Sequence, residues 1–162
     1  MSSRVKVIHN MYKHILIPTD GSDLSNKAIE HGLELAKALG AKITALTVSE
    51  PFYVSAFEPS MAEQYKKHVA ALATKHLDVA KYAASASNVA CEAVRVEHER
   101  PYQAIIDTAK ERGCDAIVMA SHGRRGVSAI VLGSETVKVL THSTVPVIVV
   151  RGQNASKYFA AS

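Results

Sequence analysis

The chain has 162 residues, of which 48% are apolar and 21% charged, and its formal net charge is +4. These values are typical of one globular domain and exclude a disordered chain. The 19 Lys and Arg residues form no basic run, so we expect no nucleic-acid partner. No apolar stretch is long enough for a membrane helix, and residues 1–10 lack the features of a signal peptide. We therefore expect a cytoplasmic protein without membrane contact.

Strands and helices alternate from residue 14 onward. The apolar run His14–Pro18 is predicted to be a buried strand. The helix that follows has Ser22 as its predicted N-cap and Gly40 as its C-terminal stop. Ile43–Val48 is a second buried strand. Because one helix connects these two strands, they are expected to lie parallel, joined by a right-handed crossover.

The same alternation continues to residue 150. Ser60 and Glu63 have the spacing of a capping box, which predicts the start of a long Ala-rich helix. In Val89–His98 apolar and charged residues alternate, as in a half-exposed edge strand. The remaining elements are a helix opened by Pro101 and closed by Gly113, a strand at Ala116–Ala120, a helix from Ser134 to about His142, and a strand at Val145–Val150.

This order of elements predicts an α/β fold, an open, doubly wound, five-stranded parallel sheet with helices on both faces. Pro146 cannot donate a ladder hydrogen bond, so its strand belongs at one edge, and Val89–His98 belongs at the other. The order 3-2-1-4-5, with strands numbered along the chain, satisfies both conditions. It brings loops 18–22 and 121–134 together at the carboxyl ends of two central strands, where such sheets bind ligands.

The second of these loops combines glycines with the start of a helix. Gly123, Gly126 and Gly133 would let backbone N–H groups approach a ligand closely, and we expect positive φ angles there. Ser134 begins a helix, whose first N–H groups and positive dipole end attract anions. The loop matches neither the P-loop nor the dinucleotide-binding glycine pattern. It predicts a phosphate site, with an ordinary glycine-rich connection as the alternative.

Histidines and cysteines have no metal-site spacing. His68 and His76 are eight residues apart on one predicted helix, too far for a metal-binding pair, and are expected at the surface. Cys91 and Cys114 are expected to be free thiols. His122 lies within the second loop, where a structural hydrogen bond is favoured over a role as general base.

Three segments carry a resemblance to a known family: KHILIPTDGS, ASHGRRG and LGSETVKVLTHSTVPVIVVR. From about Tyr12 to Arg151 the chain resembles the universal stress protein family. Nucleotide-binding members carry the pattern Gly-x2-Gly-x9-Gly-Ser/Thr. Its last two glycines correspond to Gly123 and Gly133, and Ala120 stands where the first would be. A glycine at position 120 would permit positive φ and leave more room for a ligand.

The resemblance implies binding of ATP or AMP and assigns the site residue by residue. The segment after the first strand, including Asp20, would approach the ribose and adenine, while Val48 would line the adenine pocket. The start of the last helix would bind the phosphates, which Mg²⁺ or Mn²⁺ would bridge, with Asp20 as a candidate metal ligand. The residues expected to bind the nucleotide are Pro18, Thr19, Asp20, Val48, Met119, Ala120, Ser121, His122, Gly123, Arg124, Gly133, Ser134, Glu135 and Thr136.

The expected function is that of a nucleotide-binding sensor or regulatory module in the stress response. No nucleophile with a positioned base is evident, so we expect no enzyme, and at most slow ATP hydrolysis. Two alternatives remain open. One is a slow ATPase or phosphotransferase that uses the same pocket, and the other is an interaction protein that binds no nucleotide.

The resemblance places the domain at residues 12–151, between a flexible N-terminal extension at 1–11 and a tail at 152–162. Val145–Val150 is an apolar strand predicted at a sheet edge, without a charge before Arg151. Because exposed edge strands are usually protected by charges or by a partner, we expect a homodimer through strand 145–150. The resemblance implies the same assembly.

Overall fold

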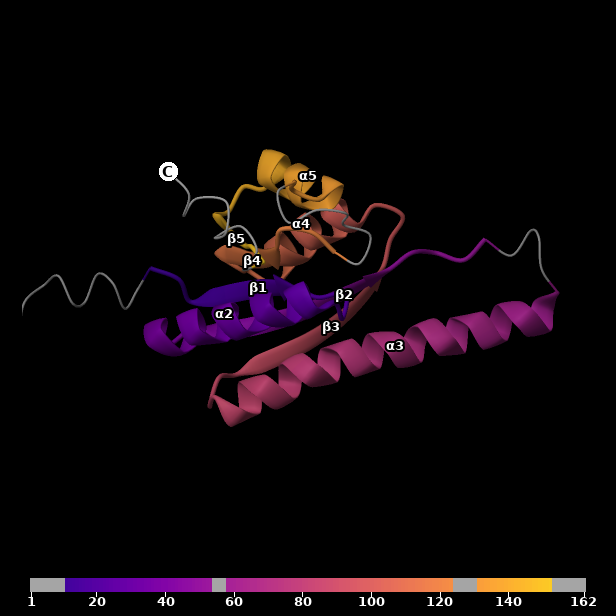
Figure 1. The fold of residues 1–162 in the computed structure, drawn as a ribbon, viewed down its shortest axis with the longest axis horizontal. Coiled ribbons are helices and arrows are strands. Elements are labelled where there is room, and N and C mark those ends of the chain that lie inside the picture. The colour runs from indigo at the N-terminus through magenta and orange to yellow at the C-terminus, as the bar shows by residue number, and fades with distance from the viewer. Residues whose placement is uncertain (1–10, 54–57, 124–130, 153–162) are drawn as a thin grey trace, which may run out of the picture.

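A five-stranded parallel sheet lies at the centre of the computed structural model, which describes residues 11–53, 58–123 and 131–152 (Figure 1). Its strand order is β3-β2-β1-β4-β5, and every neighbouring pair is parallel. The predicted fold class and strand order are therefore confirmed. The strands are β1 His14–Pro18, β2 Lys42–Ser49, β3 Cys91–Glu97, β4 Ala116–Ala120 and β5 Val147–Val150.

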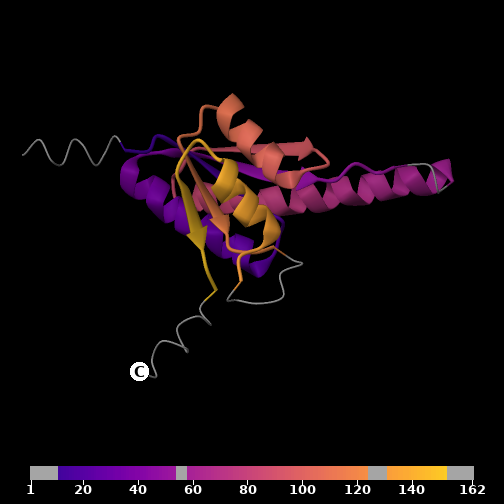
Figure 2. The same ribbon diagram turned by 90° about the horizontal axis from the view of Figure 1, so that it is seen from above.

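Helices cover both faces of this sheet (Figure 2). α2 and α3 lie on one face, and α4 and α5 lie on the other (Figure 1). Such an arrangement buries central strands on both sides, which is why their sequences read as unbroken apolar runs. The helices are α2 Asp23–Leu39, α3 Pro59–Ala86, α4 Pro101–Glu111 and α5 Ser134–His142.

Two apolar clusters fill the spaces between the layers, and β1 contributes to both. Ile15 and Ile17 are buried in the cluster on the side of α2 and α3. Leu16, between them in the sequence, is buried in the other cluster together with Ile105 of α4 and Val139 of α5. Alternate residues of a strand point to opposite faces, so β1 anchors both layers. The residues after β1 are therefore attached to the most deeply buried part of the sheet.

The predicted helix ends are partly confirmed. Ser22 caps α2 by accepting a hydrogen bond from the Ser25 amide, and Gly40 ends this helix with φ +67°. The capping box at Ser60 is wrong, because α3 begins one residue earlier at Pro59 and has no side-chain cap. Proline favours the first helical position, since its φ is already helical and that position needs no N–H.

The edge strands are shorter than predicted, although both edge assignments are right. β3 covers Cys91–Glu97 rather than Val89–His98, and β5 begins at Val147. Pro146 precedes β5, and only its carbonyl takes part in the ladder, accepting a hydrogen bond from the Ile117 amide at 2.9 Å. In the described part of the chain, no helix has the length and apolar character needed to cross a bilayer.

Candidate functional site

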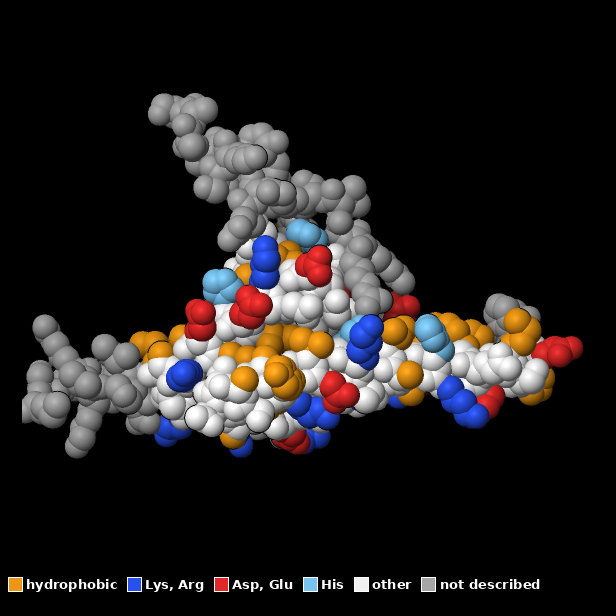
Figure 3. All heavy atoms as spheres, turned by 60° about the horizontal axis from the view of Figure 1, so that its bottom comes forward, with side chains coloured by type: hydrophobic (Ala, Val, Ile, Leu, Met, Phe, Trp, Pro, Cys, Tyr) orange, Lys and Arg blue, Asp and Glu red, His pale blue; other side chains and the backbone are white. Residues whose placement is uncertain are grey.

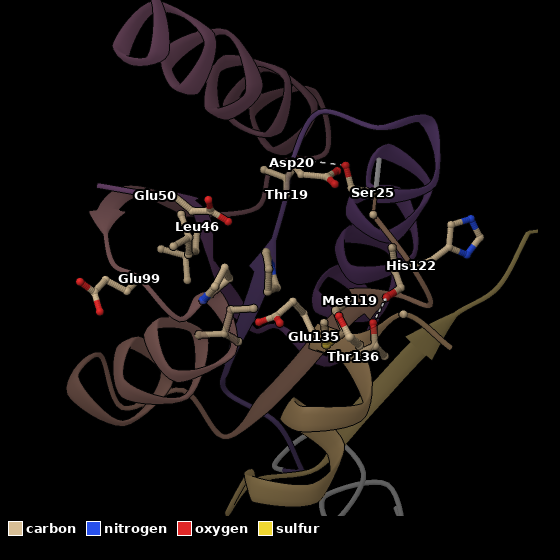
Figure 4. Close-up of a pocket in the computed structure, with 18 residues that line it drawn as sticks. Thr19, Asp20, Ser25, Leu46, Glu50, Glu99, Met119, His122, Glu135 and Thr136 are labelled. Atoms are coloured by element: carbon tan, nitrogen blue, oxygen red, sulfur yellow. Dashed lines mark hydrogen bonds between the residues drawn. The ribbon is translucent and has the colours of Figure 1, made fainter. Parts of the chain in front are cut away.

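A cavity of about 530 Å³ lies at the carboxyl ends of β1, β2 and β4 (Figure 4). The winding of the sheet reverses here, because β1 pairs with β2 on one side and with β4 on the other. Open α/β sheets bind ligands at this switch point. The volume lies within the range of small-molecule sites, about 300–1,000 Å³. The cavity is therefore the candidate site.

Twelve of the fourteen residues predicted to bind nucleotide line this cavity. Ser121 does not, because it is buried and its amide donates a hydrogen bond to the Val150 carbonyl at 2.8 Å. Arg124 lies outside the described residues, as does Gly126. The twelve are Pro18, Thr19, Asp20, Val48, Met119, Ala120, His122, Gly123, Gly133, Ser134, Glu135 and Thr136.

Six residues that were not predicted from the sequence also line the cavity. Leu46 lies two positions before Val48 and therefore on the same face of β2, so strand alternation could have identified it. Pro101 and Ile105 belong to α4, and no local pattern indicates that this helix covers the switch point. The missed residues are Ser25, Leu46, Glu50, Glu99, Pro101 and Ile105.

The loop after β1 is held by a hydrogen-bond network centred on Thr19. Its amide donates to the Leu46 carbonyl at 2.8 Å, which ties the loop to β2. Its buried hydroxyl lies 3.1 Å from the Ser25 hydroxyl and accepts a hydrogen bond from the Gly21 amide at 3.2 Å. Thr19 thus fixes the position of the next residue, Asp20.

Asp20 joins this loop to the second loop. Its Oδ1 accepts a hydrogen bond from the Ser22 amide at 3.0 Å. A Cβ atom placed on Gly123 would lie only 2.5 Å from its Oδ2, so the absence of a side chain at position 123 lets the two loops approach. The predicted positive φ at Gly123 is wrong, since the described glycines with positive φ are Gly21, Gly40 and Gly113. Gly123 serves close approach rather than unusual backbone geometry.

Gly133 has a similar role at the start of α5. Its φ is −63°, which contradicts the predicted positive value, and its amide donates to the Ser121 carbonyl at 2.7 Å. A Cβ atom there would lie 3.2 Å from the His122 Cα. Gly133 is the N-cap of α5 and supplies no side-chain hydrogen bond. The first-turn residues Ser134, Glu135 and Thr136 line the cavity, so this helix end can offer backbone N–H groups to an anion.

Two side chains at the start of α5, where the phosphates are predicted to bind, make contacts with neighbouring elements. Glu135 Oε2 accepts a hydrogen bond from the Tyr102 amide at 2.8 Å, and its Oε1 lies 3.0 Å from Lys138 Nζ. The Thr136 hydroxyl donates to the Ala120 carbonyl at 3.1 Å. These contacts join α5 to α4 and to β4, so the backbone of Glu135, rather than its carboxylate, is available to a phosphate.

The two sides of the cavity differ in chemistry. Leu46, Glu50 and Glu99 lie on one side in Figure 4, while Thr136 and His122 lie on the other. The imidazole of His122 points away from the other labelled side chains, and its Nδ1 lies 3.2 Å from the Ser121 hydroxyl. His122 was predicted to hydrogen-bond the loop backbone, whereas this contact is with the side chain of the neighbouring residue.

No group of three metal-ligating side chains occurs among residues 11–53, 58–123 and 131–152. The two cysteines are free and do not line the cavity. Burial raises the pKa of Cys114 to about 11, so this thiol is protonated and unreactive near neutral pH.

Comparison with known proteins agrees with this arrangement. Residues 11–151 match the model of the universal stress protein family. The chain belongs to this family. The universal stress protein MJ0531 of Methanocaldococcus jannaschii is 32% identical over 155 residues, which cover 93% of this chain and 89% of that protein.

Solved structures of the universal stress protein family share the fold. The structure of protein MJ0577, from the same archaeon, superposes with a TM-score of 0.79 at 27% identity. The superposition covers 89% of this chain and 99% of the MJ0577 chain. A universal stress protein solved in complex with cAMP superposes with a TM-score of 0.59 at 26% identity, covering 87% of this chain and 98% of that one.

Ala120 stands where the pattern of the nucleotide-binding family members has its first glycine, and the structure shows the surroundings of this residue. It is the last residue of β4 and pairs with Val150. Among described residues other than glycine, only Asn88 has positive φ, so position 120 does not require a glycine conformation. Ala120 belongs to an apolar cluster with Val118, so its methyl group contributes to the core. The substitution is therefore compatible with the backbone of this loop.

Proposed function

We propose that this protein binds an adenine nucleotide in the cavity and acts as a regulatory module of the stress response. The observation that carries this proposal is the start of α5, where a first turn without a side-chain cap lines the cavity. A helix N-terminus of this kind attracts phosphate groups through its N–H groups and its dipole. The relative solved with cAMP supports a ligand of the same class.

The distribution of side chains suggests how the nucleotide would be oriented. Leu46, Val48 and Ile105 form an apolar part of the cavity that suits a purine ring. Glu50 and Glu99 lie on the same side as Leu46, and their negative charges disfavour a phosphate there (Figure 4). The phosphates would therefore lie at α5, with the ribose near the Thr19–Asp20 segment.

Both AMP and ATP fit this proposal. One phosphate would use the N–H groups of Ser134 and Glu135, with the Ser134 hydroxyl as a further donor. The additional phosphates of ATP would need Mg²⁺ or Mn²⁺, with the Asp20 carboxylate as a protein ligand for that ion. Because Asp20 already accepts a hydrogen bond from the Ser22 amide, its orientation is set before a ligand arrives.

The proposal assigns binding rather than catalysis to this site. His122 contacts Ser121, and the Glu135 carboxylate contacts Tyr102 and Lys138, so neither is positioned as a general base toward the cavity. ATP hydrolysis should accordingly be much slower than the rate of about 1 s⁻¹ that marks the lower end of typical enzymes. Asp20→Asn should weaken nucleotide binding at least as much as any turnover.

Two measurements on the purified protein test this function. Mass spectrometry of small molecules released by denaturation should identify an adenine nucleotide. Isothermal titration calorimetry with AMP, ADP, ATP–Mg²⁺ and cAMP should then give a Kd in the micromolar range or tighter for at least one of them. The absence of binding to all four would refute the proposal. Turnover of several ATP per second, lost in Asp20→Asn with binding retained, would favour an enzyme instead.

We also propose that the protein forms a homodimer through β5. In the described part of the chain β5 pairs only with β4, so its other edge is available to a second strand. Ile148 is 38% exposed on this strand, which carries no charged residue. An apolar edge of this kind is usually covered by a partner, and a second copy about a twofold axis is the simplest one.

A further inference from the structure

The packed face of α3 contains one titratable side chain near its middle. Ala73, Leu77 and Ala80 are buried there at helical spacing, and His76 shares their face. His76 is half-buried, so its predicted surface position is wrong, whereas His68 on the same helix is exposed as predicted.

The imidazole of His76 lies against the loop that follows β1. A Cβ atom placed on Gly21 would be 2.2 Å from both Cδ2 and Nε2 of this ring. The ring therefore occupies the space that a side chain at position 21 would need. Gly21 also has φ +75°, a conformation that other residues rarely adopt. Two independent features thus require glycine at this position.

Gly21 lies within the turn that presents Asp20. Its amide donates to the Thr19 hydroxyl at 3.2 Å, and the next amide, of Ser22, donates to Asp20 Oδ1 at 3.0 Å. The Oδ2 atom of the same carboxylate lies beside Gly123. A continuous series of contacts therefore leads from α3 through Gly21 and Asp20 to the second loop of the cavity.

We propose that His76 is a positioning residue of the nucleotide site, through which α3 sets the affinity for nucleotide. This inference rests on the proposed function. Neither His76 nor Gly21 lines the cavity, so the imidazole acts by holding the turn in place and not by touching the ligand. Without the imidazole ring, the turn at Gly21 is packed less tightly against α3 and samples other conformations. Only the fraction of protein molecules whose turn presents Asp20 correctly then binds nucleotide.

The position of α3 gives this contact a regulatory consequence. The helix has 28 residues and projects past the rest of the described structure (Figures 1 and 3). Met61 and Tyr65, in its first two turns, are 55% and 46% exposed. A shift of the whole helix would move the ring relative to Gly21. Because coupling between two sites is reciprocal, bound nucleotide would in turn resist such a shift.

Two alanine variants on the same helix test the proposal. If the turn is competent about a tenth of the time in His76→Ala, the Kd for AMP should rise about tenfold. His68→Ala removes an exposed histidine two turns away and should leave this Kd within about twofold of the wild-type value, because His68 does not line the cavity. Hydrogen exchange of residues 19–23 in the nucleotide-free protein should be faster in His76→Ala than in His68→Ala.

A double-mutant cycle with Gly21→Ala separates this role from a general loss of stability. In the wild type the added methyl group strikes the imidazole, whereas in His76→Ala it enters the vacated space. Gly21→Ala should therefore weaken AMP binding by a smaller factor in the His76→Ala background than in the wild type. The strain at φ +75° is common to both backgrounds and cancels in the cycle.

The outcomes distinguish this inference from the proposed function. A wild-type protein that binds none of AMP, ADP and ATP would refute the proposed function and with it this inference. A His76→Ala variant that is less stable but binds AMP as tightly as the wild type would overturn this inference alone. Unchanged hydrogen exchange at residues 19–23, or equal effects of Gly21→Ala in both backgrounds, would also overturn it.

Discussion

Replacing Gly123 with alanine perturbs a point at which the two loops of the cavity approach closely, since Gly123 lies beside Asp20. The new methyl group would lie 2.5 Å from Asp20 Oδ2, a separation that Cβ atoms essentially never show. The carboxylate must therefore rotate or the second loop must retreat. Rotation would break the hydrogen bond that Asp20 Oδ1 accepts from the Ser22 amide.

The size of the effect follows from that hydrogen bond. Hydrogen bonds to charged groups contribute about 1.5–3 kcal/mol, and the partial exposure of Asp20 favours the lower end of this range. If the nucleotide must restore the original orientation of the carboxylate, a cost of about 1.5 kcal/mol raises the Kd slightly more than tenfold. The free energy of unfolding should fall by no more than about 1–2 kcal/mol, because Asp20 is partly exposed and its contact with Gly123 lies outside the apolar core.

Calorimetric titration with AMP and denaturant unfolding together measure these two quantities. Gly152→Ala is the matched control, since a Cβ atom at that position would meet nothing within 4 Å. In an Asp20→Ala background the added methyl group has no carboxylate to displace, so Gly123→Ala should then have little further effect on the Kd. An undiminished effect of Gly123→Ala in that background would show that the contact with Asp20 is not the cause.

Three further predictions concern the start of α5, the edge of the sheet and a buried histidine. Gly133→Val combined with Ser134→Ala should abolish nucleotide binding in calorimetry. A Cβ atom added at position 133 would lie 3.2 Å from the His122 Cα, and the methyl groups of valine would displace the helix end. Light scattering should give twice the mass of one chain. Ile148→Lys should give monomers or insoluble protein, because it places a charge on the apolar edge strand. A wild type that stays monomeric at high micromolar concentration would contradict the dimer. Burial, followed by the charge of Lys42, lowers the pKa of His14, while a backbone hydrogen bond with Arg112 and the charges of Asp115 and Glu92 oppose the shift only partly. Between about pH 6.5 and the lower pKa of the folded state, the unfolded chain therefore binds a proton that the folded protein does not. Stability should fall as the pH drops through this window, and less so in His14→Gln. Equal pH profiles for the two proteins in denaturant titrations would contradict this.

The sequence by itself determined the fold and the location of the cavity. The apolar runs at residues 14–18 and 116–120 were predicted to be buried strands because they are short and end at turn residues or at a glycine-containing loop, and the helices between strands made the sheet parallel. Pro146 and the alternation near Val94 then placed the two edges, which leaves β1 beside β4. These inferences work because strand periodicity, helix spacing and connection rules are properties of short segments.

Only the tertiary structure decided how the loops and helices meet around the cavity. Gly123 was predicted to adopt positive φ, but its lack of a side chain makes room for Asp20, which lies 103 positions earlier in the chain. Ile105 lines the cavity because α4 packs over the end of β2, and His76 reaches Gly21 because α3 packs beside α2. Each of these contacts depends on the relative placement of two elements, and that placement comes from packing of the whole core, which leaves no periodic signal in either segment.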